Sequence, residues 1–206
     1  MYAIITDFDG TITTFDMAHR IVEHYSGAPA PNPYADGVKE DGKEWMSRQM
    51  KSVKVSQEDF ENFVLSTAAP REGLLDLVKA CFECNVPIEI VSGGVDLYIK
   101  PFLLKQAIAG LPLFCAKGTF TSEGIELDFE DFNGLDLEDF KAAHVIKFKE
   151  LGYTVIFCGD GHTDIRAAAA ADIVFAAGHL LEKCRQQDIP ARELLSFKEV
   201  ENIIRS

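Results

Sequence analysis

The feature that most constrains this chain is a short apolar run near its start that ends in two aspartates. Ala3, Ile4 and Ile5 are small or β-branched residues, typical of a strand that is buried on both faces. Asp7 and Asp9 follow the run and are separated by one phenylalanine. Side chains alternate along a strand, so residues two apart start on the same side. We therefore expect both carboxylates to project together from the carboxyl end of this strand.

Two carboxylates held this close repel each other unless a cation or a shared proton lies between them. Gly10 follows the second acid and, because it has no Cβ, lets the chain turn away sharply. We interpret the pair as part of a divalent-metal site in which Asp7 is also a candidate nucleophile. The plainer alternative is an acidic exit from a strand into a solvated loop, and an Asp-x-Asp pair standing alone would favour it.

Two more apolar runs predict buried strands that end in polar residues. Residues 86–91 lead into Ser92-Gly93-Gly94, and residues 154–158 lead into Gly159-Asp160-Gly161. Helical patterns separate the strands, and this alternation predicts a parallel sheet covered by helices on both faces. Ligands of such sheets bind at the carboxyl ends of the strands. We therefore expect an α/β fold with a Rossmann-like sheet and an active site at one edge.

Residues 14–70 show helical patterns and no strong strand signal. Apolar residues recur at helical spacing over 17–25 and 45–53, and Ser56 with the acids after it is typical of a helix start. The prolines within residues 27–33 are expected to break the chain between the first two helices. We predict a small helical cap domain over 14–70, and an α/β core formed by residues 1–13 and 71–206.

Several downstream residues could bind a phosphate. A hydroxyl and unhindered amides at Ser92 and Gly93 suit a phosphate, although an ordinary glycine-rich turn has the same sequence. A cation is also needed, and Lys141 is the candidate because its helix leads into the strand that ends near Asp160. Lys117 and Lys147 are the rival lysines.

Two acids follow the strand at residues 154–158. Asp160 is placed to complete a metal shell with Asp7. Asp164 would lie near the start of the next helix, where it could hold metal-bound water or a neighbouring backbone group. It could also cap that helix, and the two roles are compatible.

Four motifs in this order resemble those of the haloacid dehalogenase superfamily, in particular its phosphatases. They are Asp7-Phe8-Asp9-Gly10-Thr11, the apolar strand that ends in Ser92, Lys141, and Gly159-Asp160-Gly161-His162-Thr163-Asp164. The resemblance implies an α/β core with a small helical cap, and Mg²⁺-dependent hydrolysis of a small phosphorylated metabolite. Asp7 would become an aspartyl-phosphate, and Asp9 would act as general acid and base.

The resemblance also implies how the remaining residues are used. Thr11, Ser92, Gly93 and Lys141 would bind the substrate phosphate, with Lys141 also counted among the catalytic residues. The metal ligands would be Asp7, Asp160, Asp164 and the main-chain carbonyl of Asp9. Oxygen donors of this kind suit Mg²⁺.

A finer match points to one branch of the superfamily. Arg71-Glu72-Gly73, Val91-Ser92-Gly93-Gly94-Val95-Asp96 and residues 180–185 resemble the branch that contains 2-hydroxy-3-keto-5-methylthiopentenyl-1-phosphate phosphatase and phosphoserine phosphatase. One departure is that residues 134–140 carry no cysteine, where the former enzyme has a cysteine cluster. Cap side chains should select the substrate. The candidates, each of which could instead be a surface or core residue of the cap, are His19, Trp45, Arg48 and Lys51.

Two other function classes remain open. One is a phosphotransferase or phosphomutase that returns the phosphoryl group to an acceptor, which would require a cap that excludes water. The other is a catalytically silent module that binds phosphate or a partner. Loss of Asp7 or Asp9 would mark such a module, and both acids are present.

Composition limits the partners and the cellular setting. A formal net charge of −13 argues against nucleic acid or an anionic membrane as the main partner. No apolar run approaches the about 20 residues that span a membrane, and no leader pattern is present, so we expect a cytoplasmic protein. Five cysteines, an odd number, suit reduced thiols; Cys81-x-x-Cys84 lies in a helical pattern, with a redox or zinc pair as the alternative.

Overall fold

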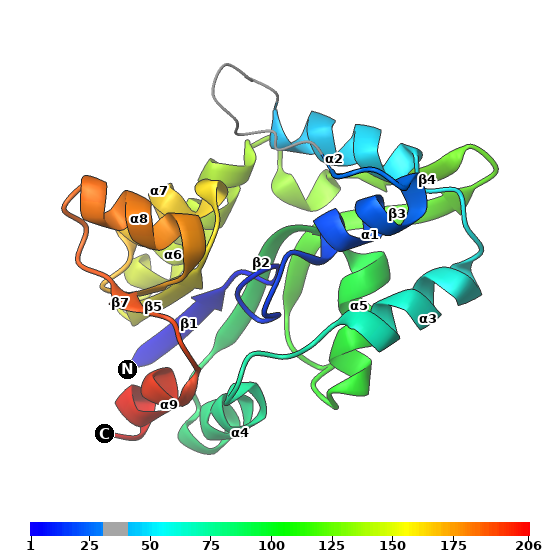
Figure 1. Ribbon diagram of the computed structural model, residues 1–206. Helices are drawn as coiled ribbons and strands as arrows, with labels where there is room; N and C mark the ends of the chain where they lie inside the picture. Colours follow the sequence, from blue (N-terminus) through cyan, green and yellow to red (C-terminus); the bar gives the residue numbers. More distant parts are fainter. Residues whose placement is uncertain (31–40) are drawn as a thin grey trace.

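The computed structural model describes residues 1–30 and 41–206, and a twisted sheet lies at its centre (Figure 1). The strands are β1 (Tyr2–Thr6), β2 (Ile88–Val95), β3 (Leu113–Thr121), β4 (Gly124–Asp128), β5 (Thr154–Gly159), β6 (Ile173–Ala176) and β7 (Arg192–Glu193). In the described chain they form one seven-stranded sheet in the order β4-β3-β2-β1-β5-β6-β7. Neighbouring strands are parallel except β3 and β4, which are antiparallel.

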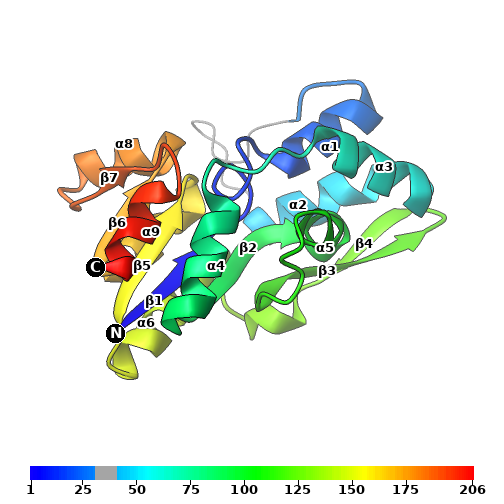
Figure 2. The ribbon, with the colours of Figure 1, turned by 90° about the horizontal axis from the view of Figure 1, so that it is seen from below.

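Helices cover both faces of this sheet. The helices of the described chain are α1 (Met17–Ser26), α2 (Gly42–Lys51), α3 (Gln57–Thr67), α4 (Leu74–Cys84), α5 (Asp96–Lys105), α6 (Leu137–Glu150), α7 (Ile165–Ala170), α8 (Gly178–Gln186) and α9 (Lys198–Arg205), with short 3₁₀ turns at Glu130–Phe132 and His162–Asp164. Ile4 packs in an apolar cluster with α4 and α9, and Ile5 packs in another with α6, α7 and α8. Figures 1 and 2 show these two helix layers on opposite sides of the sheet. The predicted α/β fold with helices on both faces is confirmed.

The central position of β1 explains its composition. It pairs with β2 on one side, where Ile4 faces Ile88, and with β5 on the other, where Ile4 faces Ile156. A strand paired on both edges and covered on both faces has no solvated side, so every position favours an apolar residue. Because β1, β2 and β5 are parallel, their carboxyl ends meet at one edge.

Helices α1, α2 and α3 lie beside the β3–β4 hairpin, which extends past the rest of the sheet (Figure 2). The predicted helix start at Ser56 is confirmed, since its hydroxyl accepts a hydrogen bond from the Asp59 amide (3.1 Å). The Phe60 ring of α3 meets the Phe120 ring of the hairpin edge-on, with centroids 5.4 Å apart. The division into a cap of residues 14–70 and a core of 1–13 and 71–206 stays a prediction, because the hairpin belongs to the second range but packs against the first.

Some predicted boundaries differ from the structure. Residues 70–73 show the features of a helix start in the sequence, but α4 begins at Leu74, because the Arg71 amide bonds to the Ile12 carbonyl and keeps the preceding segment extended. Ser92-Gly93-Gly94 is not a turn after the strand; β2 continues to Val95, with a register shift against β3.

Two elements have little sequence signal. Helix α8 has only one apolar cluster, and the two-residue strand β7 is exposed throughout. Residues 31–33 of the predicted break lie outside the described residues. Within residues 1–30 and 41–206, no helix has the length and apolar character that a membrane crossing requires. All five cysteines are free thiols.

Candidate active site

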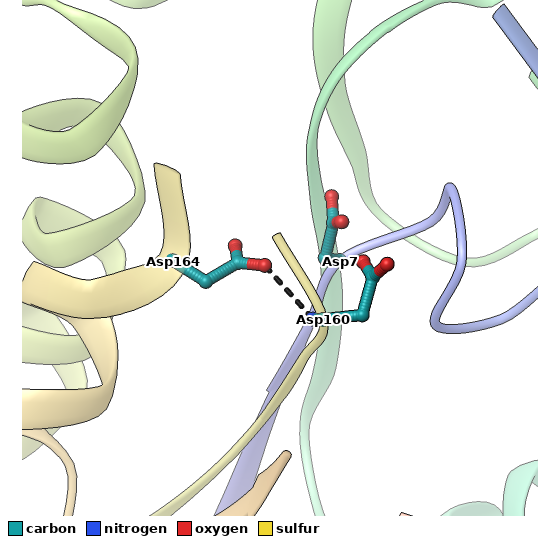
Figure 3. A group of neighbouring side chains, drawn as sticks. All are labelled: Asp7, Asp160 and Asp164. Atoms are coloured by element: carbon teal, nitrogen blue, oxygen red, sulfur yellow. Dashed lines mark hydrogen bonds between the residues drawn. The ribbon is translucent and has the colours of Figure 1, made fainter. Parts of the chain in front are cut away.

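Three carboxylates gather at the carboxyl edge of the sheet. Asp7 directly follows β1, Asp160 directly follows β5, and Asp164 closes the next 3₁₀ turn. One oxygen of each lies within 4.8 Å of the others. Figure 3 shows the Asp7 and Asp160 carboxylates close together, with Asp164 reaching toward the main-chain nitrogen of Asp160. The adjacency of β1 and β5 thus brings Asp7 together with Asp160 and Asp164, which lie far along the sequence from it.

Lys141 of α6 supplies positive charge to this cluster. Its Nζ lies 2.9 Å from Asp7 Oδ1 and 2.6 Å from Asp164 Oδ1, and its side chain is only 2% exposed. The second oxygen of Asp164 accepts hydrogen bonds from the amides of Asp160 (3.0 Å) and Gly161 (2.9 Å). Asp164 therefore orients both the lysine and the loop that carries Asp160.

The two rival lysines lie elsewhere. Lys117 of β3 donates to Asp131 (3.0 Å) on the molecular surface. Lys147 of α6 donates to Glu89 (2.8 Å). Neither lines the cavity described below, whereas Lys141 does.

The acids carry more negative charge than Lys141 can balance. Burial raises the pKa of Asp7 to about 7, although the ammonium of Lys141 opposes the shift. Burial, followed by the charge of Asp7, raises the pKa of Asp160 to about 8. Burial alone would lower the pKa of Lys141, but the carboxylates of Asp164 and Asp7 hold it above its usual range. When all three acids are ionised, one ammonium leaves two negative charges uncompensated, and this excess of clustered carboxylate oxygen fits a divalent cation such as Mg²⁺.

The Asp9 carboxyl turns away from the acid cluster. Its Oδ1 accepts a hydrogen bond from the Met17 amide (2.9 Å), and its Oδ2 accepts one from the Tyr98 hydroxyl (2.6 Å). Burial, with the nearby charge of Asp16, raises its pKa well above the usual range, which favours a protonated carboxyl. Its side chain is not among the three clustered acids of the described chain, so a metal role for Asp9 rests on its main-chain carbonyl.

A cavity of about 390 Å³ opens in front of the acids. At one end it is lined by Asp7, Asp9, Ser92, Gly93, Gly94, Lys141 and Asp160. The Ser92 hydroxyl, at the floor, accepts a hydrogen bond from the Gly94 amide (3.0 Å). Side chains from α1, α2, the turn after β5 and the first turns of α6 and α8 line the other end, among them His19, Trp45, Met46, Leu137, His162 and His179. The cavity thus has charged side chains at one end and mostly aromatic and apolar side chains at the other.

The cap contributes part of the predicted substrate wall. The rings of His19 and Trp45 lie 5.1 Å apart, and His19 Nδ1 lies 2.6 Å from Asp16, which raises the pKa of this imidazole. Both residues line the cavity. Arg48 and Lys51 instead line a separate hollow on α2 beside Phe129.

Thr11 differs from what the resemblance implied. Its side chain is buried and does not line the cavity; its hydroxyl donates to Asp160 Oδ1 (3.2 Å). Thr11 therefore supports an acid of the cluster rather than facing a bound phosphate. Gly10 has φ +69°, and a Cβ there would overlap the Asp160 carboxylate, so glycine is needed for the close approach of the two loops.

Two residues that sequence reasoning did not place in the site support it. The Arg71 guanidinium donates to the carbonyls of Thr11 (2.7 Å), Gly10 (2.6 Å) and Leu194 (2.9 Å), which fixes the loop after β1. Tyr98 holds Asp9, as described above. Arg71 stood within a motif of the resemblance, but no sequence signal marks Tyr98, because its partner lies 89 residues away.

Comparisons with known proteins agree with this geometry. Residues 4–169 match the family model of the haloacid dehalogenase-like hydrolases. The chain is 32% identical to a 2-hydroxy-3-keto-5-methylthiopentenyl-1-phosphate phosphatase of Geobacillus thermodenitrificans, covering 96% of this chain and 92% of that protein. A phosphatase of the same name from Bacillus velezensis is 29% identical, with 96% and 87% covered. The chain also matches, at 29% identity, 48% of the length of the bifunctional enzyme MtnB/MtnX of Bacillus licheniformis.

Solved structures show the same fold. A phospho-aspartyl intermediate analogue of phosphoserine phosphatase has a TM-score of 0.69 at 19% identity and covers 98% of this chain and 97% of its own. A phosphoserine phosphohydrolase-like protein from Francisella tularensis has a TM-score of 0.70 at 23% identity, with 99% and 100% covered. With the family model spanning most of the sequence and the relatives matching along nearly all of it, the chain belongs to the haloacid dehalogenase-like hydrolase family, among its phosphatases.

Proposed function

We propose that this protein hydrolyses the phosphate monoester of a small metabolite through an aspartyl-phosphate at Asp7, with Mg²⁺ as cofactor. The observation that carries the proposal is the Asp7 carboxylate, which lines the cavity at the end of β1 with Lys141 Nζ 2.9 Å away. A carboxylate oxygen beside a fixed ammonium can approach a phosphate that would otherwise repel it.

The metal would be held by Asp7, Asp160 and the Asp9 main-chain carbonyl, with Asp164 supporting them. When bound, Mg²⁺ supplies positive charge that lowers the repulsion between the nucleophile and the substrate phosphate. This assignment is supported by the clustered carboxylate oxygens. Burial, and after it the charge of neighbouring carboxylates, raises the pKa of Asp7 and Asp160, and a bound cation would favour their ionised forms.

The chain's own residues provide the rest of the chemistry. An Asp7 oxygen attacks phosphorus while the bond to the leaving oxygen breaks, and Asp9 gives that oxygen a proton. Lys141 and the Ser92 region stabilise the charge on the other phosphate oxygens. In the second step a water molecule attacks the phosphorus of the aspartyl-phosphate, and Asp9 takes a proton from that water. This step releases inorganic phosphate and restores the Asp7 carboxylate.

The wall of the cavity and the relatives together suggest which esters to examine. Trp45, Met46 and Leu137 give the wall apolar surface, and His19 and Asp16 add polar groups. Several relatives are named as phosphatases of 2-hydroxy-3-keto-5-methylthiopentenyl-1-phosphate, whose leaving group also mixes apolar and hydroxyl chemistry. We propose this enol phosphate, or an ester of similar size, as the first candidate substrate.

The test is a phosphate-release screen of the purified protein with Mg²⁺. It would include the methylthiopentenyl ester, phosphoserine, sugar phosphates, nucleotides and pyridoxal phosphate, with the Asp7→Asn variant as control. One strongly preferred ester supports the proposal and identifies the substrate. Transfer to an added alcohol without net phosphate release would favour a phosphotransferase. Phosphate binding without turnover of any ester would favour a silent binding module.

A further inference from the structure

Tyr98 lies in the first turn of α5 and contacts Asp9. Its hydroxyl donates to Asp9 Oδ2 over 2.6 Å, and the residue is 0% exposed. The ring packs beside Phe8, with centroids 6.1 Å apart, so it is held within the core. Asp9 lines the cavity and Tyr98 does not, so any influence of Tyr98 on a substrate passes through Asp9.

A glycine in the backbone near Tyr98 and Asp9 leaves room for their contact. Gly94, the last residue but one of β2, lies close to the point where the two side chains meet. A Cβ at Gly94 would overlap the Tyr98 hydroxyl and come within 2.7 Å of Asp9 Oδ2. A side chain at this position would therefore force the hydroxyl and the carboxyl apart.

The two oxygens of Asp9 are held by different parts of the chain. Oδ1 is bonded by the Met17 amide at the start of α1, which belongs to the predicted cap, and Oδ2 is bonded by Tyr98 from the core. In the described chain, the hydrogen bond from Tyr98 is the one that a side chain of the core donates to this carboxyl. A phenol can donate and accept, so the contact suits the carboxyl before and after it transfers a proton.

We propose that Tyr98 is a positioning residue that holds the Asp9 carboxyl in place for proton transfer to the leaving oxygen. The inference rests on the proposed function, in which Asp9 is the general acid. If Tyr98 has this role, loss of its hydroxyl should lower the rate most for esters whose leaving group must be protonated. An alkoxide needs one, whereas p-nitrophenolate leaves readily without one.

The test compares kcat/KM of Tyr98→Phe on two esters, an alkyl phosphate that the enzyme hydrolyses and p-nitrophenyl phosphate. This constant reports the steps through departure of the leaving group. Phenylalanine keeps the ring and removes only the hydroxyl. We expect a loss of about 10-fold on the alkyl ester and at most about 2-fold on p-nitrophenyl phosphate, since one positioned hydrogen bond to a carboxyl is removed. Tyr25→Phe is the matched control, because its hydroxyl donates to the Asp59 carbonyl, away from Asp9; both esters should be unaffected.

Asp9→Asn, alone and combined with Tyr98→Phe, completes the experiment. Asp9→Asn should lower kcat/KM on the alkyl ester strongly, and adding Tyr98→Phe should lower it little further, because the carboxyl to be positioned is gone. An equal loss on both esters, or no loss on either, in Tyr98→Phe alone would overturn the positioning role while leaving the proposed function intact. If Asp9→Asn itself hydrolyses the alkyl ester normally, the general-acid role falls, and the inference falls with it.

Discussion

Helix α6 contributes to two acid–base clusters that differ in burial, in charge balance and in the chemistry they allow. The first is the active-site cluster, in which Lys141 contacts Asp7 and Asp164. The second, which we call the Glu89 cluster, lies further along the same helix. There His144 Nδ1 lies 2.8 Å from Glu89 Oε2, and Lys147 donates to Glu89 Oε1 over 2.8 Å.

The balance of charge separates the two. At the active site one lysine serves several acids, and the pKa of Asp7 is raised. In the Glu89 cluster one acid meets two nitrogen bases. Burial would raise the pKa of Glu89, but the hydrogen bonds from His144 and Lys147 lower it. A cluster with surplus acid can bind a cation and offer a nucleophile, whereas a balanced cluster is suited to hold a helix against a sheet.

The largest effect should come from removing the nucleophile. Asp7→Asn leaves no carboxylate to attack phosphorus, so kcat should fall by at least about 10⁴-fold. Because the folded-state pKa of Asp7 is raised, its charge opposes folding above its unfolded value of 3.8, and metal-free Asp7→Asn should unfold at the same temperature or higher at pH 8. Phosphate release and thermal unfolding measure the two properties. Substantial remaining turnover would contradict the nucleophile assignment.

Removing the metal should come next. Treatment with a chelator should abolish hydrolysis, and added Mg²⁺ should restore it. Because the cation would bind only the folded protein, Mg²⁺ at about 100 times its dissociation constant should stabilise the fold by about 2.7 kcal/mol. Asp160→Asn should weaken this stabilisation, and Glu89→Gln should not. Equal responses of both variants would contradict the distinction between the clusters.

Lys141→Met should lower kcat by about 10² to 10³-fold, because a fixed positive charge beside the phosphate is lost. It should also destabilise the metal-free protein by about 3 kcal/mol, because two buried carboxylates lose their shared partner. Steady-state kinetics and chemical unfolding would measure these losses. A variant that loses stability but keeps its kcat would show that Lys141 is structural only.

The sequence predicted one of these clusters and not the other, for a physical reason. Asp7 and Asp160 each end an apolar strand, and parallel strands bring their ends together, so the meeting point follows from the fold class. Glu89 lies inside a strand, and nothing local shows that it faces α6. Its partners are 55 and 58 residues away, and their approach depends on how the helix packs. The same limit applies to Tyr98, which meets Asp9 only through the position of α5.

Glu89→Gln should affect stability and leave catalysis alone. Because the folded-state pKa of Glu89 lies below its ordinary value of 4.5, the carboxylate stabilises the fold above that pH, and the contribution is lost as the pH falls through the folded-state pKa. We expect the variant to be less stable by about 2 kcal/mol at pH 7, with the difference shrinking below pH 4.5. Its kcat at pH 7 should stay within about twofold. A pH-independent difference would show that packing, and not charge, is what the substitution removes.

Lys147→Met should give the smallest effect. The Lys147 side chain is 49% exposed, so water and salt screen its attraction to Glu89. Its Nζ lies 4.8 Å from the centre of the Phe148 ring, and methionine retains much of the apolar stem that packs there. We expect a loss of about 0.5 kcal/mol that diminishes in high salt, with unchanged kinetics. Chemical unfolding of Lys147→Met beside Lys141→Met tests whether burial explains the different stability contributions of these two lysines of α6. Equal losses of stability would show that it does not.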